Sequence, residues 1–100
     1  MLRWNKEERR DNRQKIVSTS YVASAPCLGR VSIHPYIHSP GEWFLTCQSL
    51  HIDKHPLGSI SPEEAERLAE AELVKRLEGH IDWCRSALNE VRGESDASAL

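Results

Sequence analysis

The stretch from Ser61 to Gly93 constrains the fold most, because it carries both a start signal and a stop signal for one long helix. Ser61 is a good N-cap residue, and Glu64, three residues later, completes the pattern of a capping box. Pro62 suits the first helical position, where its missing N–H has no intrahelical partner to lose. Gly93 supplies the left-handed residue that commonly ends a helix. The sequence therefore predicts one helix of 31 residues, from Pro62 to Arg92.

Length and composition indicate one soluble domain. The chain has 100 residues, of which 39% are hydrophobic and 28% charged, as in ordinary globular proteins. We expect a single domain over residues 1–93, followed by a disordered polar tail at 94–100. No apolar run approaches the length of about 20 residues that a membrane span needs, and the first residues do not resemble a signal peptide. Cys27, Cys47 and Cys84 are widely spaced and odd in number, which favours free thiols. We therefore expect a cytoplasmic protein without membrane contact.

Charge is spread unevenly along the chain. The net charge is −2, but residues 1–15 hold six basic and three acidic side chains, hence +3. Residues 59–100 hold five basic and ten acidic side chains, hence −5. The basic segment and the acidic helix could attract each other, within one chain or between two, or either could meet a charged partner.

Three segments before the helix have the composition of strands. Ile16–Ala23 is rich in β-branched residues, Gly29–His38 alternates between apolar and polar residues, and Trp43–Leu50 places three apolar side chains on one face. Ser39–Glu42 contains Pro-Gly and predicts a type II turn between the last two strands. Residues 51–60 are interpreted as a connection, with a short fourth strand inside it as the alternative.

The segment from residue 5 to residue 15 contains no apolar side chain, so we expect an exposed loop or a short solvated helix. The four residues before it are interpreted as a short edge strand anchored by Trp4. The predicted fold is therefore α+β: an antiparallel sheet of three or four strands, packed on one face by the long C-terminal helix. A stripe of small residues would let the helix approach the sheet closely: Ala65, Leu68, Ala69 and Leu73.

The residues that could carry chemistry do not form a convincing catalytic or metal site. His34 and His38 are four residues apart, as are His51 and His55, so each pair could in principle share a zinc ion. No Cys-x-x-Cys pair or acidic cluster supports that interpretation. Cys47 is expected on the core face, where a thiol is inert. We therefore predict no catalytic residue, no metal and no cofactor.

Nucleic-acid binding is an alternative that the sequence leaves open. An open sheet face with aromatic and basic side chains could stack bases, while a basic N-terminal segment contacts phosphates. The acidic helix and the sequence pI of 6.2 weigh against it. For either a nucleic acid or a protein partner, the candidate binding residues are Arg9, Arg10, Arg13, Arg30, His34, Tyr36 and His38.

A resemblance to a family adds to this interpretation. The motif Gly41-x-Trp43-x-Leu45 is followed by Pro56-Leu57-Gly58-x-x-Ser61-x-Glu63-Glu64-Ala65 and by Ala69-Glu70. Over about half of the chain, this layout resembles small accessory proteins encoded by phages and other mobile elements. The resemblance implies a non-enzymatic protein that binds a host protein or protein complex. Some phage proteins of this size inhibit host defence systems, anti-CRISPR proteins among them.

The second half of the predicted helix carries a heptad pattern. Apolar residues recur at spacings of 3, 4, 3, 4 and 3: Val74, Leu77, Ile81, Cys84, Leu88 and Val91. A 31-residue helix spans about 46 Å and an eight-residue strand about 26 Å, so the sheet cannot cover the whole helix. Either this seam joins two copies as an antiparallel homodimer, or the helix breaks at Gly79 and folds back. We favour the homodimer.

Overall fold

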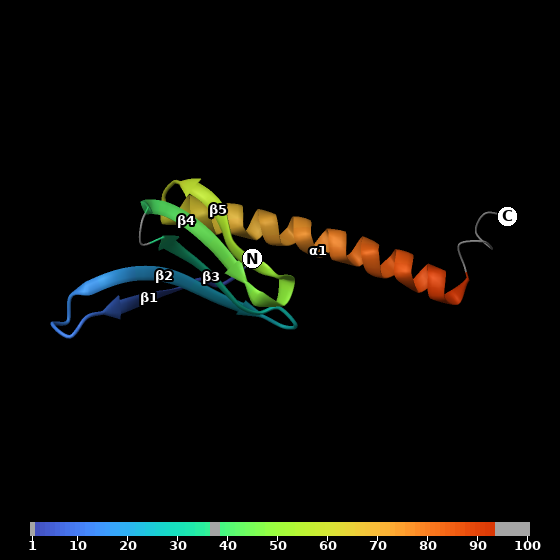
Figure 1. Ribbon diagram of the computed structural model, residues 1–100, viewed down its shortest axis with the longest axis horizontal. Coiled ribbons are helices and arrows are strands. Elements are labelled where there is room, and N and C mark those ends of the chain that lie inside the picture. Colours follow the sequence, from blue (N-terminus) through green and yellow to red (C-terminus); the bar gives the residue numbers. More distant parts are fainter. Residues whose placement is uncertain (1, 37–38, 94–100) are drawn as a thin grey trace.

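The computed structural model describes residues 2–36 and 39–93. Five strands form one antiparallel sheet, and each strand pairs with its neighbours in chain order (Figure 1). The elements are β1 (Asn5–Arg10), β2 (Ile16–Ala25), β3 (Gly29–Tyr36), β4 (Ser39–Cys47), the short 3₁₀ turn η1 (Gln48–Leu50), β5 (Ile52–Ser59) and α1 (Pro62–Arg92). The α+β class is confirmed, but the predicted count of three or four strands was too low.

The strand that the sequence did not reveal, β1, and the strand that it offered only as an alternative, β5, lie at the two edges of the sheet. β1 occupies part of the segment expected to be a loop or a helix, and all six of its residues are exposed. An edge strand needs backbone partners rather than a buried face, so the lack of apolar residues did not prevent it from forming. β5 is irregular: its register against β4 shifts twice, and Lys54 and Gly58 have φ angles of 52° and 106°. These bulges obscure the alternation of side chains by which a strand is recognised.

The predicted turn at Ser39–Glu42 was wrong, because these residues belong to β4. Tyr36 pairs with Ser39, whereas the preceding Pro35 pairs with Trp43. The residues between Ser39 and Trp43 therefore bulge from β4, and Gly41 adopts a φ of 92° there. Pro40 and Gly41 therefore lie in this bulge and do not form a chain reversal.

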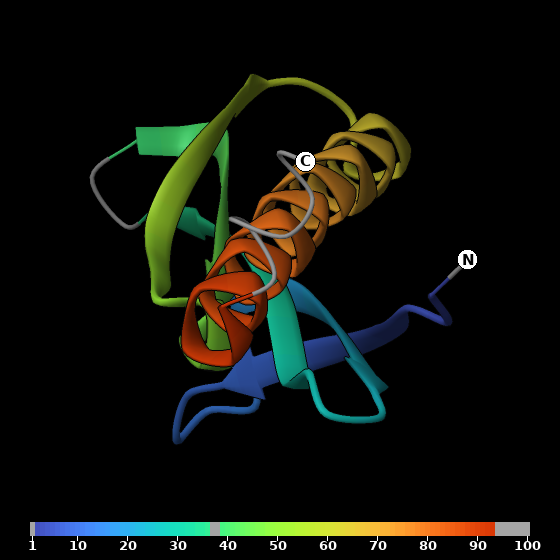
Figure 2. The same ribbon diagram turned by 90° about the vertical axis from the view of Figure 1, so that its right-hand side faces the viewer.

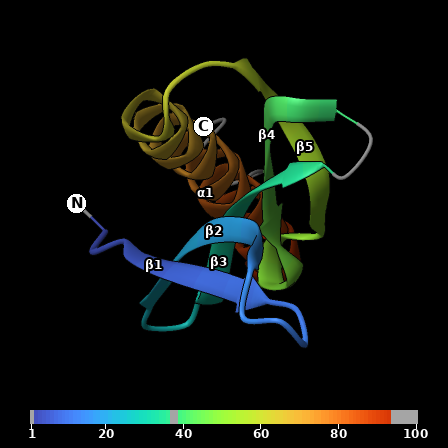
Figure 3. The same ribbon diagram turned by 90° about the vertical axis from the view of Figure 1, so that its left-hand side faces the viewer.

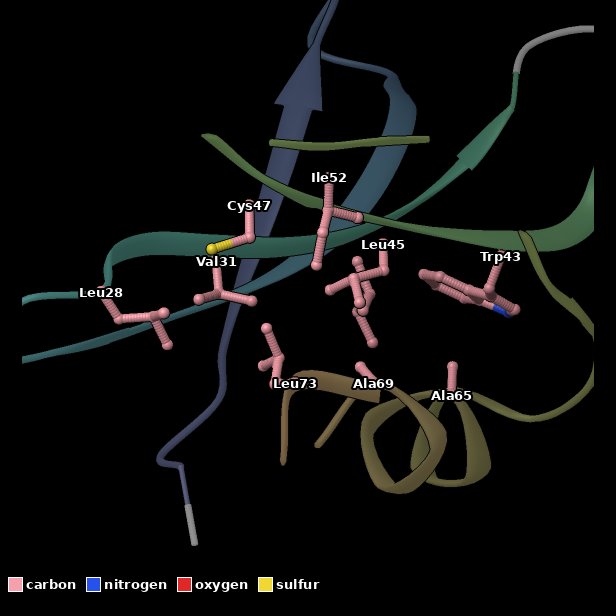
Figure 4. Packing of buried hydrophobic residues seen from close by; sticks show 10 residues of the cluster. Leu28, Val31, Trp43, Leu45, Cys47, Ile52, Ala65, Ala69 and Leu73 are labelled. Atoms are coloured by element: carbon pink, nitrogen blue, oxygen red, sulfur yellow. The ribbon is translucent and has the colours of Figure 1, made fainter. Parts of the chain in front are cut away.

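The core lies between the sheet and the first three turns of α1 (Figure 4). Ala65, Ala69 and Leu73 are buried on the helix, and they pack against fully buried side chains of the central strands, among them Val31, Ile33, Leu45 and Cys47. The two alanines let the helix approach the strands closely. Leu68, which was predicted to share this stripe, is 40% exposed because it lies about 100° round the helix from Ala69.

The ends of α1 confirm the predicted signals. The Ser61 hydroxyl accepts a hydrogen bond from the Glu64 N–H at 3.2 Å, and Gly93 has a φ of 70°. The helix runs without interruption through Gly79, so the alternative of a break and a fold-back was wrong. The strands lie on one side of α1 and curve around its first half (Figure 2, Figure 3).

After Leu73, no residue of the described part of α1 is buried. The rest of the helix, residues 74–92, extends past the sheet, and the molecule measures 68 × 23 × 23 Å (Figure 1). We call this part the projecting helix. Although α1 has 31 residues, none of its stretches is apolar enough to cross a membrane.

The segment before β1 is fixed to the helix rather than to the sheet. Residues 2–4 do not form the expected edge strand. Instead the Trp4 indole N–H and the Leu2 backbone N–H both donate to Oε1 of Glu70, at 2.9 and 3.2 Å. Trp4 is thus an anchor, as predicted, but its partner is α1. These bonds place the start of the described chain where α1 leaves the sheet.

Candidate functional site

Two parts of the molecule extend away from the core, and they lie at opposite ends of its long axis (Figure 1). One is the projecting helix. The other is the outer part of the β1–β2 hairpin. β3 pairs with β2 only from Tyr21 onward, so residues 7–20 form a two-stranded ribbon beyond the sheet, which we call the arm (Figure 3).

The tip of the arm is a well-bonded turn. Oδ1 of Asp11 accepts the backbone N–H groups of Arg13 and Lys15 at 2.8 and 2.9 Å. The Asp11 N–H in turn donates to the Lys15 carbonyl at 2.9 Å, and Gln14 takes a φ of 65°. These bonds therefore fix the backbone at Arg13 and Lys15, and both residues are exposed at the tip.

The predicted basic residues divide into two groups. Arg10 pairs with Glu8 at 3.3 Å, and Arg30, on β3, pairs with Glu7 at 3.2 Å. By contrast, Arg9 and Arg13 make no ion pair among the residues that the structure describes. Of the four arginines proposed for partner binding, these two are therefore the best placed to meet an external anion.

The arm also exposes two apolar side chains that the sequence interpretation did not single out as a site. Ile16 and Val17, at the outer end of β2, are 51% and 56% exposed. Tyr21 and Ala23 of β2 lie on the core side of the sheet, and Val17 is an even number of residues away from both. The alternation along β2 puts it on that side, but the arm lies beyond the reach of α1. The signal that could have found this pair is their position next to a segment without apolar residues.

His34 lies on the outer face of the sheet, which is the face turned away from α1. Its ring stacks on Phe44 with centroids 6.3 Å apart, and its Nε2 lies 2.9 Å from Oγ1 of Thr46. The side chain of Tyr36 and the whole of His38 lie outside the described residues. Of the predicted group of His34, Tyr36 and His38, the structure therefore describes only the side chain of His34. Its ring contacts Phe44 and Thr46.

The histidines considered for zinc do not share one side of the sheet. His55 faces α1, where its Nε2 lies 3.3 Å from Oε1 of Glu72, whereas His34 lies on the opposite face. His51 is exposed in the turn after η1. Within residues 2–36 and 39–93, no three His, Cys, Asp or Glu side chains gather as they would around a metal.

The cysteines are free, as expected. Cys47 is buried, whereas Cys27 and Cys84 are exposed. The Sγ of Cys84 lies 3.7 Å from Nε2 of His80 on the preceding turn of the helix. The ring of His80 also stacks on Trp83, which is 66% exposed and was not singled out from the sequence.

The seam of the projecting helix is uncovered along its whole length. Cys84 is exposed. The aliphatic members of the seam have exposed fractions between 37% and 86%: Val74, Leu77, Ile81, Leu88 and Val91. At its base the seam opens into a mainly apolar hollow of about 400 Å³, lined by Leu2, Ala25, Leu28, Glu70, Leu73, Val74 and Leu77. The structure thus groups the predicted interface residues on one unoccupied surface.

We found no significant match between this chain and known protein families, curated proteins or solved structures. What the protein does must therefore be argued from its own surfaces.

Proposed function

We propose that this protein is a non-enzymatic binding protein of phage or mobile-element type, and that it holds a host protein through its arm. The observation that carries the proposal is the exposure of Ile16 and Val17 on a projecting ribbon that also bears Arg9 and Arg13. The buried centre of a protein interface is rich in apolar surface, and arginine is among the residues that contribute most to binding energy there. The resemblance to small phage proteins supports a host defence protein as the target, as for anti-CRISPR proteins.

The chemistry of the arm defines the surface that it would fit. Because consecutive strand residues point to opposite faces, Ile16 and Val17 would each require an apolar contact, on the two sides of the arm. Arg9 and Arg13 would require carboxylates nearby, because guanidinium groups bind carboxylates with two parallel hydrogen bonds. The partner should therefore present a mixed apolar and acidic surface. A protein of this kind acts by occupying that surface, and needs no catalytic residue.

The experiment is affinity capture from a host lysate, with the wild type compared to variants of the arm. Ile16→Asp and Val17→Asp place a charge in the proposed contact but lie outside the core, so circular dichroism should show an unchanged fold. Gln48→Asp adds the same charge at an exposed site away from the arm. Recovery of one stoichiometric protein by the wild type and by Gln48→Asp, but not by the arm variants, supports the proposal. Equal recovery by all four proteins contradicts it.

Nucleic-acid binding is the second candidate, because the major groove of DNA admits a two-stranded ribbon of this kind. Arg9, Arg13 and Lys15 would contact phosphates. Glu7, Glu8 and Asp11 lie on the same ribbon and reduce its positive charge, which is why we place a protein partner first. Captured material that disappears after nuclease treatment would favour this second candidate.

A further inference from the structure

The projecting helix lacks the contacts that normally stabilise an amphipathic helix. Such helices owe most of their stability to tertiary packing of the apolar face, and isolated helices of this length are marginal in water. Here that face is uncovered from Val74 to Val91, a distance of about 26 Å along the axis. We propose that a second copy of this chain covers it, with the two helices antiparallel and Val74 facing the partner's Val91.

The spacing of the seam is compatible with this arrangement. In an antiparallel pair, an a position of one helix faces a d position of the other. The spacings 3, 4, 3, 4 and 3 read the same in both directions, so a two-fold axis between residues 82 and 83 leaves no seam residue without a partner. The layers pair Val74 with the partner's Val91, Leu77 with the partner's Leu88, and Ile81 with the partner's Cys84.

Charges beside the seam select the antiparallel direction. In the register above, Glu78 comes close to the partner's Arg85, and the symmetry makes this attractive contact twice. In a parallel pair, the residues brought together would be His80 with the partner's Arg85, and Leu73 with the partner's Glu78. Neither combination is an ion pair. The antiparallel dimer therefore has the better electrostatic complementarity.

In the proposed dimer, the hollow at the base of the seam would bury Val91 of the partner subunit, the most exposed of the large aliphatic side chains of α1. Val91 is 86% exposed in the single chain. In the proposed register, the partner's Val91 arrives at Val74, which lines the hollow together with Leu2, Leu28 and Leu77. The sheet covers α1 only up to Leu73, so the two sheets lie at opposite ends of the dimer and do not collide. Parallel helices would bring both sheets to the same end.

Disulfide cross-linking tests the register directly. In a background of Cys27→Ser and Cys84→Ala, with Cys47 left buried, the pair Val74→Cys and Val91→Cys should give a covalent dimer on mild oxidation. Either substitution alone should remain a single chain, because the same position in the two helices is about 26 Å apart. Cross-linking by Val74→Cys alone would show a parallel pair and overturn the proposal. Absence of a covalent dimer from the double variant would overturn it as well.

A charge exchange tests the same register without cysteines. Glu78→Arg should weaken the dimer about tenfold, measured by sedimentation equilibrium, because two attractive contacts become repulsive. Adding Arg85→Glu to that variant should restore the wild-type affinity. A double variant as weak as the single one would contradict the pairing. These residues are far from the arm, so this test can fail while host capture succeeds, and the reverse.

Discussion

The indole N–H of Trp4 donates a hydrogen bond of 2.9 Å to Oε1 of Glu70, a residue 66 positions further along the chain. The same oxygen accepts the backbone N–H of Leu2 at 3.2 Å. One carboxylate thus fixes the start of the described chain to the turn of α1 where the sheet stops covering the helix. Leu2 and Glu70 also line the hollow at the base of the seam, so this contact shapes the proposed dimer interface.

Removing that carboxylate should destabilise the fold. Glu70→Ala leaves the N–H groups of Trp4 and Leu2 without their acceptor, and we expect the free energy of unfolding to fall by about 1–3 kcal/mol. Urea denaturation measures this change. Glu90→Ala, at an exposed site on the projecting helix, is the control and should change stability by less than about 0.5 kcal/mol. Similar stabilities for the two variants would show that the Glu70 contacts carry little energy.

The close approach of helix and sheet depends on small side chains. Ala69 is fully buried against the strands, whereas Ala71, two residues later, is exposed. Ala69→Leu should therefore overpack the core and cost about 1–3 kcal/mol, while Ala71→Leu should be nearly neutral. Thermal unfolding of the two variants checks this. Equal melting temperatures for the two variants would contradict the prediction, because they would mean that the larger side chain at position 69 does not destabilise the packing of helix against sheet.

Local signals in the sequence were sufficient to predict α1 and the strands that form the core. The N-cap at Ser61 and the stop at Gly93 depend on neighbouring residues only, and both are present in the structure. The apolar alternation of Val31 and Ile33, and of Trp43 and Leu45, likewise follows from local pattern, and all four residues are buried.

What the sequence could not reveal depends on distant partners. β1 is a strand because β2 lies beside it, and none of its own side chains signals that pairing. The Trp4–Glu70 bond joins two segments that are 66 residues apart and that no local rule connects. For the candidate site, the basic residues and the seam were recognised, but the arm was missed because its existence follows from β1. The exposure of Ile16 and Val17 depends on the position of α1, and in the sequence only their place next to a segment without apolar residues pointed to it.

Glu66 should make stability depend on pH. Partial burial, followed by repulsion from Glu63 and Glu70, raises the pKa of the Glu66 carboxyl above its ordinary value of 4.5. Its ionisation is therefore harder in the folded chain than in the unfolded chain. The stability that this group contributes is present below the unfolded pKa and is lost as the pH rises through the folded pKa.

Glu66→Gln removes this effect. The variant should unfold at a slightly higher temperature than the wild type at neutral pH, and the difference should vanish near about pH 3, where the carboxyl is protonated in both states. Melting curves across this pH range provide the measurement. A variant that is less stable than the wild type at neutral pH would show that the ionised carboxylate is stabilising.

The arm makes the nucleic-acid alternative testable through salt. Arg10 is engaged by Glu8, so the informative double substitution is Arg9→Ala with Arg13→Ala. If these side chains contact phosphates, the slope of log K against log salt should become shallower by about two units. The wild type should then shift DNA or RNA in a mobility assay at ~50 mM salt. No shift with any nucleic acid under those conditions would end this alternative.

A charge introduced into the seam should disrupt the dimer, whereas the same charge on another face of α1 should not. Ile81→Asp puts an unpaired charge into the proposed interface, and we expect monomers whose projecting helix, left without its partner, shows a lower helix content by circular dichroism. Trp83→Asp introduces the same charge at a side chain that is 66% exposed but lies on another face of α1. That variant should remain a dimer. If both variants behave alike, the seam is not the contact.

The mass of the wild-type protein in solution tests most directly the claim that the projecting helix joins two copies of the chain. One chain has a mass of 11.4 kDa, and light scattering at tens of micromolar should give twice that value. On dilution the mass should fall toward that of one chain, because a seam of two and a half heptads binds with limited affinity. A mass of 11.4 kDa at tens of micromolar would contradict the account.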